Sequence, residues 1–229
     1  MAGVIAQNLF HRVGDLRTGV DVLSDVSLEA PAGAVTAVVG PAGSGKTSLL
    51  HVLAGLDRPT SGTVVLDGRT LRGLDDIELT RLRRDSIGLL LPAASVLPTI
   101  TVRENVALPL LIARRPPEPA AVDALLERVG LAEVADCRPA ELTGSDRQRV
   151  ALARALIGGP SLLLADEPAA HMDCEQGAEL LLLLREIAHE DGVTVVLFTR
   201  DIDDAAGVAD HIVALEAGRV VAAAAPLAA

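Results

Sequence analysis

The sequence has 229 residues, which is enough for one α/β domain that carries an inserted lobe. Half of the residues are hydrophobic but only 1% are aromatic, so Leu, Val, Ile and Ala must fill the core. A net charge of −11 argues against a protein that binds nucleic acid non-specifically. The first residues lack a signal-peptide pattern, and no run approaches the roughly 18 consecutive apolar residues of a membrane span. We therefore expect a water-soluble chain that reaches a membrane only through a partner.

The first part of the chain predicts antiparallel strands followed by a buried strand. Residues 4–9 and 20–29 alternate apolar and polar side chains, as half-buried antiparallel strands do. Residues 35–39 lack this alternation, which predicts a strand buried on both faces. A short strand is predicted over residues 63–66, ended by the Asp67-Gly68 turn.

The strongest motif lies between these strands, where residues 40–47 read GPAGSGKT and fit G-x-x-x-x-G-K-[ST]. Its glycines allow several backbone N–H groups to point inward and form an anion-binding nest at the start of a helix, predicted over residues 48–54. Lys46 is the only lysine beside 19 arginines, and we expect it to reach the β- and γ-phosphates. The Thr47 hydroxyl is expected to hold Mg²⁺. The predicted phosphate-binding residues are Gly40, Pro41, Ala42, Gly43, Ser44, Gly45, Lys46, Thr47 and Ser48.

The middle of the chain predicts a helical lobe. A polar helix over residues 75–84 and a buried strand over 87–91 precede it. Prolines and glycines then separate successive helical patterns. The predicted helices are 101–115, 120–129 and 146–157.

The remaining third predicts a return to the α/β core, with an Ala-rich tail, 221–229, that we expect to fray. We therefore predict a single domain over residues 1–229, with its core at about 1–91 and 160–229 and a helical subdomain at about 92–159. The predicted elements of this third are strands 161–165, 193–198 and 211–215, and helices 175–190 and 201–208.

Two acidic residues end the strand predicted over residues 161–165. The segment reads LLLADEP, and its acids occupy the end of a strand where an α/β sheet presents ligand-binding groups. Asp166 is expected to bind the Mg²⁺ that Thr47 holds, and Glu167 to accept a proton from an attacking water as general base.

With these motifs, the chain resembles the ATP-binding subunit of an ABC transporter over nearly its whole length. The matching segments read GPAGSGKT, GLDRPTSG, RRDSIG, TVRENVALPLL, RVGL, RQRVALARAL and LLLADEP. LDRPTSG and ENVALPLL are most similar to the lipoprotein-release and macrolide-export branch. The resemblance implies an α/β P-loop NTPase (RecA-like) core with an antiparallel β portion and an inserted α-helical subdomain, and ATP and Mg²⁺ as cofactors.

The resemblance also implies partners. ABC ATP-binding subunits close head-to-tail on two ATP molecules, each held between one subunit's phosphate loop and the other's signature motif, and closure drives an integral-membrane permease. Asp173 matches the loop that crosses this dimer interface, with His171 and Cys174 beside it as packing residues. We expect a homo- or heterodimer bound to a permease, with no nucleic acid. The expected location is the cytoplasm, at the inner face of the cell membrane.

Two positions that complete the nucleotide site in this family differ here. An aromatic ring near position 13 normally stacks on adenine, and Val13 takes its place. Either adenine capture is weakened, or Phe10 or His11 substitutes for the ring. Pro92 stands where a glutamine normally touches Mg²⁺ and the attacking water, and proline has neither a polar side chain nor an N–H group.

The signature motif, usually L-S-G-G-Q, reads LTGSD over residues 142–146. Thr143 keeps a hydroxyl for a γ-phosphate, and Gly144 is retained. Ser145 adds a Cβ that restricts positive φ. Asp146 is expected to cap the helix, which favours stability, and also to repel the partner's phosphate.

Arg200 replaces the switch histidine. Arginine either clamps a γ-phosphate without carrying a proton, or pairs with Asp201 or Asp203 on the surface.

The sequence therefore predicts a subunit that binds Mg·ATP and hydrolyses it slowly or hardly at all. The alternative is a regulatory module that clamps a membrane protein complex without turnover. A P-loop GTPase or kinase is disfavoured, because the sequence has no guanine-reading N-K-x-D motif and its one lysine already belongs to the phosphate loop.

Overall fold

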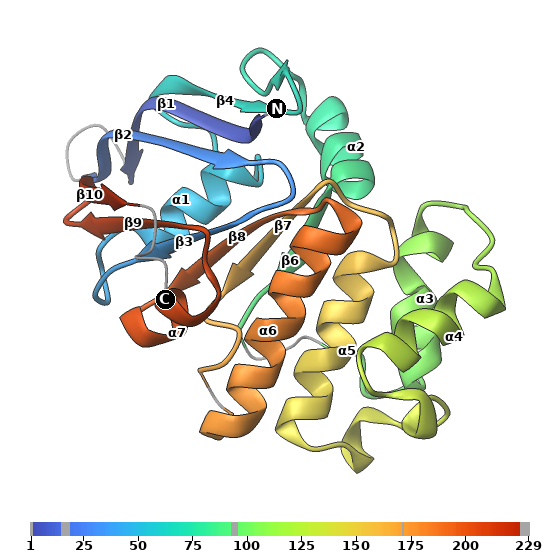
Figure 1. Cartoon of the computed structure of the whole chain (residues 1–229). Coiled ribbons are helices and arrows are strands. Elements are labelled where there is room, and N and C mark those ends of the chain that lie inside the picture. The colour runs from blue at the N-terminus through green and yellow to red at the C-terminus, as the bar shows by residue number, and fades with distance from the viewer. Residues whose placement is uncertain (1, 15–18, 93–95, 171, 225–229) are drawn as a thin grey trace.

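The computed structural model describes residues 2–14, 19–92, 96–170 and 172–224. An antiparallel sheet lies over a larger, mostly parallel sheet (Figure 1). Its strand order is β2-β1-β4-β5, and the Asp67-Gly68 turn joins its last two strands, both residues having positive φ. Its strands are β1 (Ala2–Val13), β2 (Val20–Pro31), β4 (Ser61–Leu66) and β5 (Arg69–Thr70).

The larger sheet has the order β10-β9-β3-β8-β7-β6, and all its neighbours are parallel except β9 and β10. Every residue of β3, β7 and β8 is buried, which explains why their sequences do not alternate. The strands are β3 (Val35–Val39), β6 (Ile87–Leu90), β7 (Leu162–Asp166), β8 (Thr194–Thr199), β9 (His211–Glu216) and β10 (Arg219–Ala224).

Strand β10 corrects the expectation that the chain frays from residue 221. It pairs antiparallel with β9 through a turn in which Ala217 and Gly218 both have positive φ. Alanine rarely adopts this conformation, so the sequence carries a weak turn signal before an Ala-rich strand. Residues 225–229 of the expected frayed tail lie outside the described residues.

Helix α1 (Lys46–Leu53) lies between the two sheets (Figure 1). Its Leu49, Leu50 and Leu53 share one core cluster with strand residues of both sheets. The four apolar residues of its sequence KTSLLHVL, Leu49, Leu50, Val52 and Leu53, are all buried in this position. This packing fixes the start of α1 against the ends of the parallel strands.

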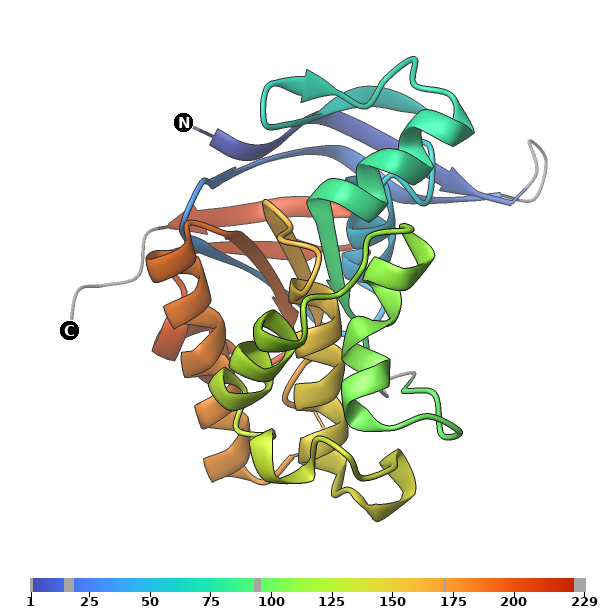
Figure 2. The same ribbon diagram turned by 90° about the vertical axis from the view of Figure 1, so that its right-hand side faces the viewer.

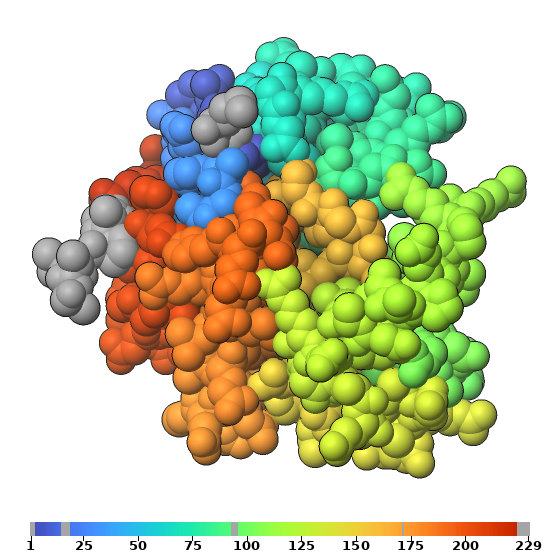
Figure 3. Space-filling model, turned by 45° about the vertical axis from the view of Figure 1, so that its right-hand side comes forward, coloured from blue at the N-terminus to red at the C-terminus, as the bar shows by residue number. Residues whose placement is uncertain are grey.

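The other face of the parallel sheet is covered by helices (Figure 2). Helices α3, α4 and α5 pack on one another, and Figure 3 shows this green-to-yellow segment on one side of the molecule beside the orange α6. Two 3₁₀ turns, Ala132–Val134 and Pro139–Glu141, separate α4 from α5. The helices are α2 (Asp76–Ser86), α3 (Val102–Ile112), α4 (Pro119–Arg128), α5 (Gly144–Leu156), α6 (Cys174–Asp191) and α7 (Ile202–Val208).

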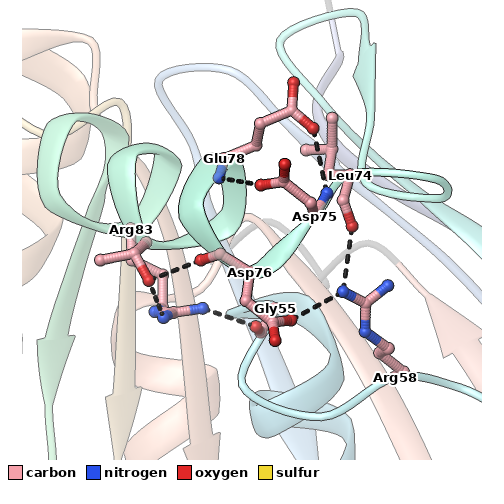
Figure 4. A network of polar contacts seen from close by, with 8 residues as sticks. Gly55, Arg58, Leu74, Asp75, Asp76, Glu78 and Arg83 are labelled. Atoms are coloured by element: carbon pink, nitrogen blue, oxygen red, sulfur yellow. Dashed lines mark hydrogen bonds and ion pairs between the residues drawn. The ribbon is translucent and has the colours of Figure 1, made fainter.

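A polar network ties both ends of α2 to the loop that follows α1 (Figure 4). The Arg58 guanidinium donates to the Leu74 carbonyl at 3.0 Å and to the Asp76 carboxylate at 2.8 Å. Arg83 donates to the Gly55 carbonyl at 2.8 Å. These contacts lie outside the phosphate-loop cavity described below.

Candidate functional site

The phosphate loop is the turn between β3 and α1. Gly45 precedes α1 with φ +103°, and a Cβ there would lie 2.7 Å from the Val22 carbonyl oxygen. A Cβ at Gly40 would lie 2.1 Å from the Leu215 carbonyl oxygen. Glycine is therefore required at both positions, by backbone conformation at the first and by close approach of a strand at the second. The resulting loop exposes backbone N–H groups at a helix N-terminus, where anions bind.

Lys46 is buried at the first position of α1. Its ammonium donates to the carbonyl oxygens of Gly40 at 2.5 Å and Pro41 at 3.0 Å. Burial lowers the pKa of Lys46, with the nearby carboxylates opposing this effect and Arg200 adding to it. The ammonium is thus held across the mouth of the loop, where a compact positive charge faces any bound phosphate.

Thr47 and Asp166 face each other across the same loop. The Thr47 hydroxyl donates to Asp166 Oδ2 at 3.5 Å, and Asp166 is only 6% exposed at the end of β7. Burial, followed by the charge of Glu167, raises the pKa of Asp166, whereas Lys46 and Thr47 lower it. A buried carboxylate beside a hydroxyl is the donor set that Mg²⁺ prefers, and a divalent cation would favour the ionised form. These residues therefore fit a magnesium ion.

Glu167 has φ +46°, an uncommon conformation for a residue with a side chain. Its backbone N–H donates to the Phe198 carbonyl on the neighbouring strand at 2.8 Å. Its Oε1 accepts a hydrogen bond from Arg200 Nε at 2.8 Å. The ion pair of Arg200 is therefore with Glu167, rather than with Asp201 or Asp203 as the surface alternative expected. Asp201 is instead the N-cap of α7, accepting from the Asp203 N–H at 2.8 Å.

These groups line one open cavity of about 430 Å³. Pro92 is part of its wall, so a residue without a hydrogen-bond donor occupies the position of the family glutamine. The predicted site residues that do not line this cavity are Val13, Gly40, Pro41, Ser44, Thr143, Gly144, Ser145 and Asp173. The lining residues are Val22, Ala42, Gly43, Gly45, Lys46, Thr47, Ser48, Pro92, Asp166, Glu167 and Arg200.

The signature segment differs from expectation in its geometry. Helix α5 begins at Gly144 with Thr143 as N-cap, so Asp146 is the third helical residue of a capping box and not the cap. Thr143 Oγ1 donates to Asp146 Oδ2 at 2.7 Å and accepts from the Asp146 N–H at 3.1 Å. Ser145 is buried within the first helical turn without positive φ, so the expected backbone restriction does not arise.

The adenine-stacking position is open at the surface. Val13 ends β1 and is 51% exposed, and Phe10 is 41% exposed. His11 is buried, with Nε2 lying 3.8 Å from Asp57 Oδ2. Of the two substitutes considered from the sequence, Phe10 is therefore accessible to a ligand and His11 is turned inward.

Asp173 is the N-cap of α6, where it accepts from the Gln176 N–H at 2.8 Å. Cys174 beside it is exposed and is not part of a disulfide, whereas His171 lies outside the described residues. Within the described ranges, no cluster of three His, Cys, Asp or Glu side chains is arranged to hold a metal ion. The helices described here are all too short or too polar to cross a membrane.

Asn105 is a polar residue that the sequence did not single out. It is fully buried on α3, and its side chain satisfies backbone groups of residues 97–101. The sequence feature that could have indicated this role is the position of Asn105 on the apolar face of a predicted helix, within the segment TVRENVALPLL.

A glycine-rich loop between a buried parallel strand and a helix, with an acidic strand end beside it, defines a P-loop NTPase. Comparisons with known proteins narrow this class. The ABC transporter family profile matches residues 23–170. The chain is 43% identical over 197 residues to the lipoprotein-releasing system ATP-binding protein LolD of Shewanella frigidimarina, covering 85% of this chain and 82% of that protein. It is 41% identical over 217 residues to the methionine import ATP-binding protein MetN 1 of Rhodococcus jostii, covering 94% of this chain and 64% of that protein.

Solved structures agree with the sequence comparisons. The dimeric ATP-binding cassette MJ0796, in a post-hydrolysis state with ADP and Pi, matches with a TM-score of 0.89 and 33% identity, covering 99% of this chain and all of that one. The structure of cbiO1 from Clostridium perfringens, part of the complex cbiONQ, matches with a TM-score of 0.89 and 26% identity, covering 98% and 89%. The chain belongs to the ABC transporter family as an ATP-binding subunit, near the LolD branch, with a P-loop NTPase fold. The expected family and fold class are confirmed.

Proposed function

We propose that this subunit binds ATP with Mg²⁺ in the phosphate-loop cavity and couples dimer closure to a membrane permease, while hydrolysing ATP slowly. The observation that carries the proposal is the convergence of Lys46, Thr47 and Asp166 on one cavity beside the phosphate loop. The names of the similar proteins support a role in transport. The dimeric form of MJ0796 supports a paired subunit. That cbiO1 is part of the ABC transporter complex cbiONQ supports assembly of this subunit into such a complex, with a permease at the inner face of the membrane as its proposed partner.

Within this proposal the residues have separate roles. The loop from Gly40 to Ser48 holds the phosphates, Lys46 contacts the terminal ones, and Thr47 and Asp166 hold Mg²⁺. The bound ion would neutralise charge on the phosphates. Glu167 is the proposed general base. Thr143, Gly144, Ser145 and Asp173 would face the nucleotide of a second subunit, and Val13 or Phe10 would lie near adenine. The helical subdomain at about residues 92–159 would contact the permease.

We expect slow hydrolysis because catalytic groups typical of the family are missing from this subunit or are already hydrogen-bonded to other residues. Pro92 offers no side-chain donor, and Arg200 is not a proton carrier near neutral pH. The Thr143 hydroxyl is engaged by Asp146, whose carboxylate also places a negative charge at the end of α5 that would meet a partner's phosphate. Each lost positioning group can reduce the rate by about 10–10³-fold, so we expect turnover far below that of an intact site.

The test is phosphate release by the subunit purified with its permease, compared with the same complex carrying Glu167→Gln. We expect ATP to bind and phosphate release to be slow, and Glu167→Gln to lower it further. Lys46→Ala should abolish ATP binding measured by titration with labelled nucleotide. Rapid turnover by the wild-type complex would contradict slow hydrolysis. Absence of ATP binding by the wild-type complex would contradict the proposal as a whole.

A second candidate is a regulatory module that clamps a membrane protein complex without turnover. The engagement of Glu167 by Arg200 favours it, because the proposed base already has a partner. This candidate predicts that ATP changes assembly with the membrane partner while Glu167→Gln changes nothing. Any loss of phosphate release in Glu167→Gln would exclude it.

A further inference from the structure

The contact between Arg200 and Glu167 is built into adjacent strands of the parallel sheet. Asp166 at the end of β7 is paired with Phe198 of β8, and the Glu167 N–H donates to the Phe198 carbonyl at 2.8 Å. On the other strand, the Thr199 carbonyl accepts from the Gly40 N–H at 3.3 Å. The Asp201 N–H donates to Thr199 Oγ1 at 3.0 Å. Hydrogen bonds therefore hold the backbone at the ends of both strands, and the side chains of Glu167 and Arg200 meet between these two neighbouring strand ends.

The surroundings direct the two side chains toward each other. Asp201 is engaged in capping α7, so its Oδ1 already accepts a hydrogen bond. Lys46, the other cation in the cavity wall, is directed at the carbonyl oxygens of the phosphate loop. Asp166, the other carboxylate among the described lining residues, faces Thr47. Glu167 and Arg200 are thus the remaining pair of opposite charges in the cavity.

We propose that Arg200 is a positioning residue that holds Glu167 in a resting arrangement and thereby limits hydrolysis. This inference rests on the proposed function, because it attributes part of the slow ATP hydrolysis to the contact between Arg200 and Glu167, which a substitution can remove. In hydrolysis the water oxygen bonds to the γ-phosphorus, the bond from that phosphorus to the bridging oxygen breaks, and the water proton passes to Glu167, leaving ADP and phosphate. A carboxylate held by a guanidinium is withheld from that water.

The geometry favours a strong contact over an incidental surface pair. The Glu167 side chain is 16% exposed, whereas Arg200 is 58% exposed. The charge-assisted hydrogen bond at 2.8 Å therefore ends on a largely desolvated carboxylate, where electrostatic attraction exceeds that of an exposed pair. The exposed guanidinium leaves room to shorten the side chain at position 200 without opening the core.

The test measures kcat and KM for phosphate release by the complex with the permease, in wild type and in Arg200→His, Arg200→Gln and Arg200→Lys. Removing one charge-assisted contact corresponds to about a tenfold change or more. We expect Arg200→His and Arg200→Gln to raise kcat by about tenfold with KM changed less than about threefold. Arg200→Lys keeps the positive charge and should keep the low kcat. Adding Glu167→Gln to Arg200→His should remove the gain.

Arg58 supplies a matched control. It is also 58% exposed and also pairs with a carboxylate at 2.8 Å, that of Asp76, outside the cavity (Figure 4). Arg58→His should leave kcat unchanged, and thermal midpoints should show that every variant is folded. A kcat that stays low in both Arg200→His and Arg200→Gln while ATP still binds would overturn the inference and leave the proposed function standing. A gain in Arg200→Lys equal to that in Arg200→His would also overturn it.

Discussion

Asn105 shows how one buried side chain organises the loop that precedes α3. Its Oδ1 accepts from the Leu97 N–H at 2.8 Å, and its Nδ2 donates to the carbonyl oxygens of Leu97 at 3.1 Å and Thr101 at 2.9 Å. Asn105→Ala would remove a fully buried side chain and leave these partly buried backbone groups without their partner, so we expect a loss of about 2–4 kcal/mol in the free energy of unfolding. Urea unfolding measures it, with Gln176→Ala, an exposed amide side chain on α6, as control. A loss below about 0.5 kcal/mol would show that water replaces the amide.

At the residue scale, the candidate site could be predicted from the sequence only for residues whose roles are indicated by one short segment of chain. Lys46 and Thr47 belong to a single motif, and Asp166 follows an apolar run that predicts the end of a strand, so local sequence was enough to predict that these three residues lie together, as they do in the cavity. The contact of Arg200 with Glu167 spans 33 residues and depends on the register of β7 and β8. No local pattern contains that register, and Asp201 was an equally reasonable partner from sequence distance.

At the scale of elements, Asp210 joins β3, α6 and β9. Its Oδ2 accepts from the Val35 N–H at 2.8 Å and lies 2.9 Å from His189 Nε2. Burial alone would raise the pKa of Asp210, but the Val35 N–H and His189 outweigh it, so the pKa lies below 3.8. The stabilisation is therefore present above pH 3.8 and is lost as the pH falls through the lowered pKa.

We expect Asp210→Asn to lower the free energy of unfolding by about 1 kcal/mol at pH 7. The difference from wild type should shrink as the pH falls below about 3.8, because the wild-type carboxyl then becomes neutral too. Chemical unfolding at a series of pH values measures it. Asp21→Asn, which removes an exposed ion pair with Arg12, should have little effect. A deficit that persists unchanged at low pH would contradict the electrostatic explanation.

The elements predicted best are those with a single strong pattern. β3 and β7 lack alternation of polar and apolar residues because both their faces are covered, and the capping residues Asp75 and Thr101 directly precede α2 and α3. The start of α5 was placed two residues late because Thr143 and Asp146 form a capping box across a glycine, which weakens the helical pattern.

At the scale of the whole molecule, binding to the folded state should stabilise the chain. Mg·ATP at about 100 times its Kd contributes about 2.7 kcal/mol, which for a domain of this size corresponds to a rise in Tm of roughly 5–10 °C. Differential scanning calorimetry with and without nucleotide measures it. Lys46→Ala should remove the shift. A wild-type Tm that does not depend on nucleotide would contradict binding by this chain.

The capping box of α5 bears on association between subunits. Asp146 Oδ2 accepts hydrogen bonds from both the backbone N–H and the hydroxyl of Thr143. These two donors at the N-terminal end of α5 are therefore already engaged by a carboxylate of the same helix. Asp146→Gln, made with Glu167→Gln to stop residual turnover, should increase the ATP-dependent dimer fraction severalfold. It should cost about 0.5–1 kcal/mol of stability. Analytical ultracentrifugation measures the dimer, with Asp136→Asn as an exposed control. An unchanged dimer fraction would show that the carboxylate does not oppose association.

The solitary lysine also makes the nucleotide cavity chemically addressable. An acylating reagent directed at primary amines has one side-chain target in this sequence, Lys46, and burial lowers the pKa of that amine, which increases its reactive neutral fraction. A label at Lys46 is therefore confined to the cavity and is separable from one on the terminal amine by peptide mass. Protection of this one amine by added ligands reports occupancy directly, without a mutation and without a measurement of turnover.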